Sequence, residues 1–251
     1  MRLLRLTFCK YSCVLTYRRL GRNGQLGNQL WQIASTIGIA RARGDQPGFP
    51  RWRYSPYFSV PAAYFPDLTA IDGEDLGNDW LQRLAYFADI EDHIRQIFTP
   101  SALAWEPIAH YHRRVLDLPH RTAIHVRRGD YSQHESYFAA LDPKYYEEAM
   151  AMTRPPYLVF SDDIAWCRRN FPSDCIFMEG NRNYEDLMLM ASCDAVIAAN
   201  STFSWWGAWL STGRRIFPRR WYAPGISAID PEVLTLDPKL KFPGDAILLE
   251  S

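Results

Sequence analysis

Short apolar runs alternate with helix-like segments through the second half of the chain. Five runs have the length and composition of buried strands, at residues 122–127, 157–160, 175–178, 195–198 and 215–218. The segments between them predict helices at residues 143–153, 164–170 and 184–192, and the first of these opens with an Asp-Pro start signal. Alternating strands and helices favour an α/β fold with a doubly wound parallel sheet.

The beginning of the chain predicts one more strand-turn-helix unit. Residues 13–18 have the pattern of a strand, and residues 21–27 form a glycine-bearing turn. Residues 28–43 predict a helix, because its apolar positions share one face: Leu30, Ile33, Ile37 and Ala40.

The middle of the chain is less regular. Residues 44–80 are rich in Pro, Gly and aromatic residues and have poor periodicity. Helices are expected after them, at residues 80–88, 92–98 and 101–116. We place a domain boundary near residues 117–120, which divides the chain into domains 1–118 and 119–251.

Composition narrows the class of protein. With 251 residues, 47% hydrophobic and 22% charged, the chain is expected to be globular. The 28 basic and 28 acidic residues balance, so nothing supports nucleic-acid binding. The five cysteines are scattered, which indicates neither a disulfide framework nor a zinc site and favours a reducing, cytoplasmic location. Arg5 and Lys10 interrupt any signal-peptide core, and no apolar run reaches the roughly 18–20 residues that a membrane span needs.

The charge is asymmetric at the start of the chain. Eight Lys or Arg residues precede Asp45, the first carboxylate. The simplest interpretation is a solvated basic face on the first strand and helix. The alternatives are a transit peptide and attraction to an anionic membrane surface, which would place the protein peripherally at the inner membrane.

The most informative local sequence is HVRRGDY at residues 125–131, at the end of a predicted strand. Ligands of open α/β sheets bind at the carboxyl ends of strands. A guanidinium there suits a diphosphate, because it stays charged and contacts two oxygens at once. Neighbouring residues of a strand point to opposite faces, so one of Arg127 and Arg128 is expected to reach the ligand and the other to pair with an acid. The alternative is a structural Arg–Asp pair.

A glycine-rich loop, GRNGQLGNQ at residues 21–29, joins the first strand to the first helix. Glycines allow the backbone to approach a phosphate, and the helix N-terminus after them offers free N–H groups. The loop matches neither the dinucleotide fingerprint nor the P-loop. A plain tight turn explains the same glycines equally well.

Two further segments place polar groups at strand ends. In CDAVIAANSTFSWWG, residues 193–207, an apolar strand leads into hydroxyls at a helix start, where phosphate or sugar hydroxyls can bind or where Ser201 or Thr202 caps the helix. Asp162 and Asp163 follow the strand at 157–160. They are candidates for a divalent cation, for a base or ribose, or for helix capping.

Taken together and in order, these segments resemble the bacterial α-1,2-fucosyltransferase family. The resemblance lies in GQLGNQLWQ (24–32), HVRRGDY (125–131), FSDDxxWC (160–167) and the stretch from NYEDLMLMASCD to NSTFSWWGAWL (183–210), which is the most specific. The chain departs from the family in two places. Extra residues precede the glycine core, and the middle region is short.

The resemblance implies two Rossmann-like domains in a GT-B-like arrangement, with GDP-fucose bound mainly by the C-terminal domain. It implies inverting transfer of L-fucose to the 2-hydroxyl of a terminal galactose in an oligosaccharide acceptor, with no metal cofactor. Arg127 would stabilise the β-phosphate of the leaving GDP, and the remaining donor-site residues would be Gly24, Gly27, Asn28, Gln29, His125, Arg128, Asp162, Asn200, Ser201, Thr202 and Ser204.

Inversion calls for a base near the acceptor hydroxyl. Glu135 and Asp130 follow the arginine motif closely enough to reach the same cleft, and Glu135 is favoured. His134, or a mechanism without a dedicated protein base, remains open.

Other functions fit parts of the pattern. The chain could fucosylate another hydroxyl or a protein, or use Asp162 and Asp163 in a metal-dependent transfer. It could also bind nucleotide sugars or glycans without catalysis. Four aromatic residues could stack on sugar rings, although core packing is the commoner role: Trp52, Tyr54, Tyr57 and Trp80.

Overall fold

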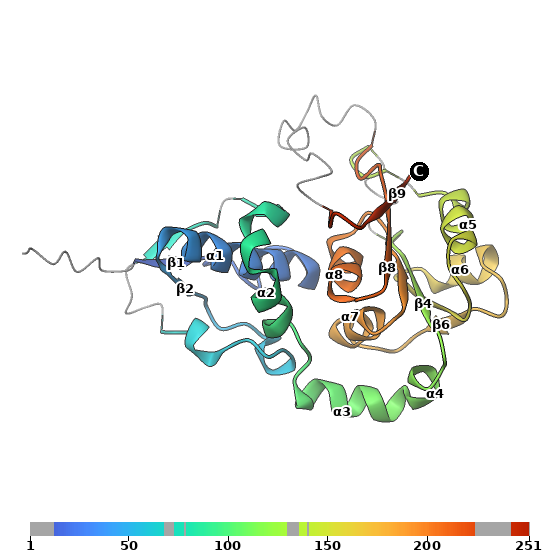
Figure 1. The fold of residues 1–251 in the computed structure, drawn as a ribbon, viewed down its shortest axis with the longest axis horizontal. Coiled ribbons are helices and arrows are strands. Elements are labelled where there is room, and N and C mark those ends of the chain that lie inside the picture. Colours follow the sequence, from blue (N-terminus) through green and yellow to red (C-terminus); the bar gives the residue numbers. More distant parts are fainter. Residues whose placement is uncertain are drawn as a thin grey trace, which may run out of the picture.

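Two separate parallel sheets organise the chain (Figure 1). The computed structural model describes residues 13–67, 73–77, 79–129, 136–139, 141–223 and 242–250. The smaller sheet has the order β2-β1-β3 and consists of β1 (Val14–Thr16), β2 (Gln46–Gly48) and β3 (Gly73–Asp75). Its two outer strands lie in the stretch whose irregular pattern predicted no element, because three-residue strands carry almost no periodicity.

The larger sheet has six parallel strands in the order β6-β5-β4-β7-β8-β9. They are β4 (Thr122–Val126), β5 (Tyr157–Ser161), β6 (Ile176–Met178), β7 (Ala195–Ile197), β8 (Arg214–Pro218) and β9 (Ile247–Leu249). The chain moves outward from β4 to β6 and then returns to the other side of β4. This is the order of a doubly wound sheet, with its switch point between β4 and β7. The predicted α/β class is confirmed, and β9 was not predicted.

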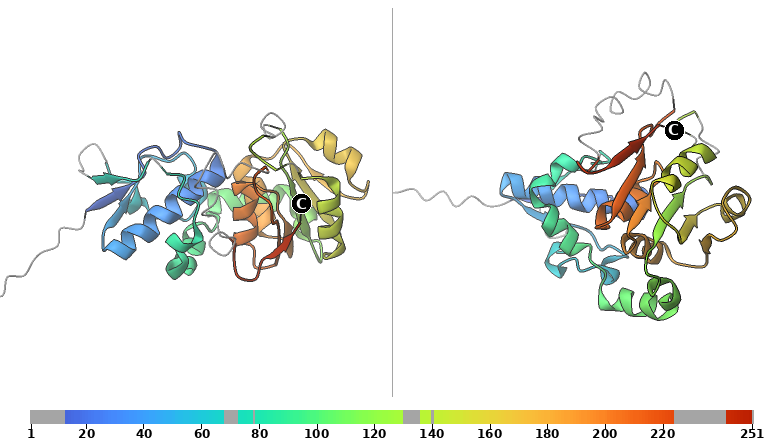
Figure 2. Two further views of the ribbon diagram at one scale, coloured as in Figure 1. Left: turned by 90° about the horizontal axis from the view of Figure 1, so that it is seen from above. Right: turned by 45° about the vertical axis from the view of Figure 1, so that its right-hand side comes forward.

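Helices cover both faces of the larger sheet (Figure 2). One hydrophobic cluster joins it to α5 (Pro143–Ala151) and α6 (Ile164–Asn170). The other joins it to α7 (Asn183–Ala191) and α8 (Thr202–Leu210). No helix among the described residues has both the length and the hydropathy needed to cross a membrane.

The first half contains α1 (Leu26–Arg43), α2 (Glu91–Ile97), α3 (Ala102–Tyr111) and α4 (Arg113–Leu116). Short 3-10 turns complete it at Ser55–Tyr57, Ala62–Tyr64, Leu84–Tyr86 and Ala88–Ile90. The helix expected at residues 80–88 is therefore wrong. Leu81 has a φ of 57°, in the left-handed region, which no right-handed helix can include. The helix expected at 101–116 is divided at His112.

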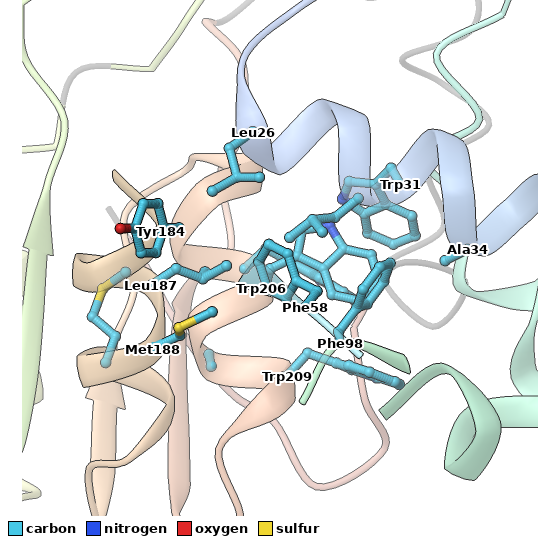
Figure 3. Packing of buried hydrophobic residues seen from close by; sticks show 14 of the residues in the cluster. Leu26, Trp31, Ala34, Phe58, Phe98, Tyr184, Leu187, Met188, Trp206 and Trp209 are labelled. Carbon is cyan, nitrogen blue, oxygen red and sulfur yellow. The ribbon is translucent and has the colours of Figure 1, made fainter. Parts of the chain in front are cut away.

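A tryptophan-rich core joins α1 to α8 (Figure 3). Trp31 of α1 is fully buried. The centre of its ring lies 4.2 Å from that of Trp205 and 5.3 Å from that of Trp206, both in α8. The hydrophobic cluster that contains them extends over both halves of the chain. The strands of the smaller sheet thus precede residue 118 in the sequence and those of the larger sheet follow residue 119. The hydrophobic core includes residues from both halves and packs α1 against α8.

Candidate functional site

A pocket of about 890 Å³ opens at the carboxyl ends of β4 and β5, beside the loop that leads from β7 into α8. The second half contributes His125, Arg127, Asp162, Asn181, Asn183, Asp186 and Ser201 through Phe203 to its wall, among others. The first half contributes residues 24–28 and Asp79, Trp80, Gln82 and Arg83. The strand order reverses between β4 and β7, and ligands of doubly wound sheets bind at such a switch point.

Arg127 lies directly after β4 and lines the pocket. Its Nη1 is 3.1 Å from Oδ2 of Asp162, which follows β5. The same carboxylate accepts hydrogen bonds from the backbone N–H of Arg128 at 2.9 Å and of Gly129 at 3.1 Å. Asp162 therefore fixes both the arginine turn and the guanidinium that the turn carries.

Arg128 points to the other side of the turn, as strand alternation predicts. Its guanidinium carbon lies 4.3 Å from the ring centre of Trp166, and its Nε is 3.9 Å from Asp163. Asp163 also caps α6 by accepting a hydrogen bond from the Trp166 N–H at 2.9 Å. Arg128 does not line the pocket, and both members of the acidic pair are engaged by protein N–H groups or guanidinium groups.

His125 is a neutral, buried group of β4 at the pocket wall. Burial and the nearby charge of Arg127 lower the pKa of its imidazole to about 3, because both disfavour the imidazolium. Its Nδ1 has no hydrogen-bond partner among the described residues.

The glycine loop brings α1 against the start of α8. Gly24 has a φ of +75°, which favours glycine. α1 begins at Leu26, two residues earlier than predicted, so Gly27 lies in its first turn. A Cβ on Gly27 would lie 2.5 Å from the backbone nitrogen of Phe203, so glycine permits this close approach of the two helices.

Asn28 ties three segments together at the pocket wall. Its Oδ1 accepts a hydrogen bond from the Thr202 hydroxyl at 2.8 Å and another from Nε2 of Gln82 at 3.2 Å. Ser201 caps α8 by accepting a hydrogen bond from the Phe203 N–H at 3.3 Å. The N-terminal ends of α1 and α8 thus face one pocket, and both offer it positive dipole ends.

Three other predicted residues lie outside the pocket lining, because their polar atoms serve the scaffold. Gln29 donates to the Gly24 carbonyl at 2.9 Å and accepts from the Trp52 indole at 2.8 Å, so it supports the glycine loop. Asn200 donates to the carbonyls of residues 139 and 221, both at 2.8 Å. The Ser204 hydroxyl donates to the carbonyl of residue 199 at 3.1 Å. Asp130, His134 and Glu135 lie outside the described residues.

Asp186 was not singled out from the sequence, although it lies in the first turns of α7 and lines the pocket. Its Oδ1 accepts a hydrogen bond from Nδ2 of Asn181 at 2.8 Å. Burial raises the pKa of its carboxyl to about 6. The sequence does show an acid in the first turn of the helix that follows β6. Acids are common at that position because they interact favourably with the helix dipole, so the pattern alone could not identify Asp186 as a site residue.

The four aromatic candidates divide between core and surface. Trp52 and Tyr54 are 1% and 6% exposed and belong to the hydrophobic core. Tyr57 stacks on Tyr184 with ring centres 3.9 Å apart. Trp80 is 46% exposed and lines the pocket.

One family model and two relatives match parts of the chain. The model of glycosyl transferase family 11 matches residues 49–223, which is more than half of the chain and excludes the glycine loop. An alpha-1,2-colitosyltransferase of Escherichia coli is 31% identical over 60% of this chain and 57% of its own length. The O-antigen biosynthesis glycosyltransferase WbnK of Escherichia coli is 36% identical over 45% of this chain and 43% of its own. The chain therefore spans about half the length of these two relatives.

More distant similarity extends over most of the chain. Galactoside alpha-(1,2)-fucosyltransferase 2 of Bos taurus is 26% identical over 88% of this chain and 78% of its own length. Among solved structures, the NodZ alpha-1,6-fucosyltransferase co-crystallized with GDP has a TM-score of 0.52 at 15% identity, over 80% of this chain and 93% of that chain. At this identity the likeness concerns the fold alone.

Proposed function

Because the chain belongs to glycosyl transferase family 11, we propose that it transfers L-fucose from GDP-fucose to the 2-hydroxyl of a terminal β-galactoside. The reaction inverts the anomeric carbon and needs no metal ion. The names of its fucosyltransferase relatives support the transferred sugar and the linkage. The observation that carries the proposal is the Arg127 guanidinium, held by Asp162 in a pocket that two helix N-termini share.

The diphosphate of the donor binds between Arg127 and the first turns of α1 and α8. Breaking the fucosyl–phosphate bond adds negative charge to GDP, so fixed positive groups aimed at the phosphates lower the barrier. Arg127 supplies the positive charge, and His125, Ser201 and Thr202 supply neutral hydrogen-bonding groups at the same wall. The guanidinium does not have to reorganise during the reaction, because the Asp162 carboxylate already holds it.

The guanine base of the donor is recognised by Asp186. Guanine presents two neighbouring donors, N1–H and the 2-amino group, and a carboxylate accepts from both. Asp162 is less suited to this role, because its oxygens already accept from Arg127 and two backbone N–H groups. The carboxylate of Asp186 accepts one hydrogen bond among the described residues, from Asn181, and Asp186 lines the pocket.

The acceptor hydroxyl loses its proton to a carboxylate that follows the arginine motif. We assign this role to Glu135, with Asp130 as the second candidate, because both lie within eight residues of Arg127 in the sequence. We further infer that the two sheets belong to Rossmann-like domains, residues 1–118 and 119–251, in a GT-B-like arrangement. The doubly wound strand order and the likeness to NodZ support that arrangement.

We also propose that the protein attaches peripherally to the inner surface of the membrane, where a lipid-linked acceptor glycan would be within reach. The basic residues that precede Asp45 would be attracted to anionic lipid. Binding to vesicles with and without anionic lipid tests this.

The test is incubation of the purified protein with GDP-fucose and a panel of lactose and type 1 and type 2 galactosides, followed by linkage analysis. The expected product carries fucose on the 2-hydroxyl of galactose, and its yield is unchanged by EDTA. GDP-fucose binding without turnover on any galactoside would instead indicate a binding protein. Product on another hydroxyl or on protein would overturn the linkage.

A second donor is favoured by one observation. The relative at 31% identity is named as a colitosyltransferase, so a donor that carries colitose is the competing substrate. Running the same assay with both donors, at equal concentrations, decides between them by the ratio of kcat/KM values.

A further inference from the structure

Trp80 is an exposed tryptophan on the wall of a pocket. The tryptophans of the core, Trp31, Trp52, Trp205, Trp206 and Trp209, are all less than 2% exposed. Trp80 is 46% exposed and lines the wall that the first half of the chain contributes. Core packing therefore does not account for this side chain.

The backbone next to Trp80 is held in an unfavourable conformation. Leu81 has a φ of 57°, although a residue with a Cβ rarely adopts the left-handed region. Its side chain is 3% exposed, its N–H donates to Oδ1 of Asp79 at 3.1 Å, and its carbonyl accepts from the Ser35 hydroxyl at 2.7 Å. Such conformations persist where surrounding contacts enforce them, and they concentrate at functional sites.

The residues on either side of Trp80 and Leu81 are anchored as well. The Tyr17 hydroxyl donates to the Asp79 carbonyl at 3.1 Å, and Nε2 of Gln82 donates to Oδ1 of Asn28 at 3.2 Å. The segment from Asp79 to Gln82 is thus fixed to Tyr17, which follows β1, and to α1. It presents an indole to the pocket from a defined position, and so avoids part of the entropy loss on binding.

We propose that Trp80 is the platform on which the terminal galactose of the acceptor stacks. The axial 4-hydroxyl of galactose leaves the hydrogens of C3, C4 and C5 on one apolar face, and an indole ring covers such a face. Asp79 and Gln82 line the pocket beside the indole and offer polar groups to the sugar hydroxyls at its edge. The inference rests on the proposed function, which places the donor diphosphate at Arg127.

The test compares Trp80→Ala and Trp80→Phe with a control on another surface, Tyr111→Ala. Tyr111 is 80% exposed, lies on α3 and is not part of the pocket. Trp80→Ala is expected to raise the KM for the galactoside about tenfold or more, which is the scale of one lost aromatic contact. Trp80→Phe should recover part of the loss, and the control should match the wild type.

Donor measurements on the same variants separate the possible outcomes. Affinity for GDP is expected to stay at the wild-type value in Trp80→Ala, because the proposed contact of the indole is with the acceptor sugar. An unchanged galactoside KM would overturn the inference while leaving the proposed function intact. A loss of GDP affinity by the same factor as galactoside affinity would also overturn it, because Trp80 would then contact the donor. If the wild type itself transfers no fucose to any galactoside, the proposed function and this inference fail together.

Discussion

The Thr202 hydroxyl donates a hydrogen bond to Oδ1 of Asn28 at 2.8 Å, across a separation of 174 residues in the sequence. Asn28 lies in the first turn of α1, which follows β1, and Thr202 begins α8, which follows β7. The bond therefore joins the starts of two helices, one of which follows a strand of the smaller sheet and the other a strand of the larger sheet. It explains why a loop from the first half and a hydroxyl cluster from the second half line one pocket.

A double-mutant cycle measures this connection. Thr202→Val and Asn28→Ala should each lower the free energy of unfolding by about 1 kcal/mol, and the double variant should lose less than the sum, because both changes remove the same bond. Denaturant unfolding gives the four values. Thr202→Ser keeps the hydroxyl and is the control. Strictly additive losses would mean that the bond contributes nothing to stability.

Gly27 should not tolerate a methyl group. In Gly27→Ala the new Cβ meets the Phe203 backbone nitrogen at 2.5 Å, so α1 and α8 must separate. The expected cost is about 1–3 kcal/mol of unfolding free energy. Gly244→Ala is the matched control, because a Cβ there meets no heavy atom within 4 Å. Equal thermal stability of the two variants would contradict this account of the helix contact.

Replacing Asp186 should remove the preference for guanine. The wild type is expected to bind GDP more tightly than IDP, because IDP lacks the 2-amino group from which the Asp186 carboxylate would accept a hydrogen bond. Asp186→Asn should weaken GDP binding about tenfold or more and bring the two nucleotides to similar affinities. Calorimetric titration gives both constants. An undiminished preference for GDP in the variant would place base recognition elsewhere.

The raised pKa of Asp186 also predicts a pH dependence of stability. The folded protein holds this proton more tightly than the unfolded chain, with a pKa of about 6 against an ordinary value of 3.8. The stabilisation by the protonated carboxyl is complete below the lower value and is lost as pH rises through the higher one. Asp186→Asn cannot ionise, so its unfolding free energy should rise relative to wild type between these pH values and then level off. A constant difference across the range would mean that the pKa is ordinary.

Much of the scaffold could be predicted from the sequence, because buried strands carry a strong local signal. The apolar run that contains Ile124 became β4, and the Asp-Pro signal did start α5, where Asp142 accepts a hydrogen bond from the Tyr145 N–H. The irregular residues 44–80 hid two three-residue strands. The helix expected at 80–88 failed because Leu81 adopts a left-handed backbone, which depends on tertiary contacts and not on its own propensity.

The polar residues of the site also divide into features that local sequence predicts and features that depend on tertiary contacts. The local sequence pattern predicted that Arg127 and Ser201 lie at strand ends, and both line the pocket. It could not tell them from Gln29 or Asn200, whose side-chain amides bond loop carbonyls instead. That distinction depends on which partners the folded chain brings near each amide.

The account depends most directly on the Arg127 guanidinium, and turnover of GDP-fucose by Arg127→Ala tests it. With folding verified by circular dichroism, kcat is expected to fall at least a hundredfold, which corresponds to about 3 kcal/mol or more of lost transition-state stabilisation. Arg128→Ala changes the same residue type one position along the turn, outside the pocket lining, and should lose much less. A folded Arg127→Ala protein that turned over GDP-fucose at the wild-type rate would contradict the mechanism.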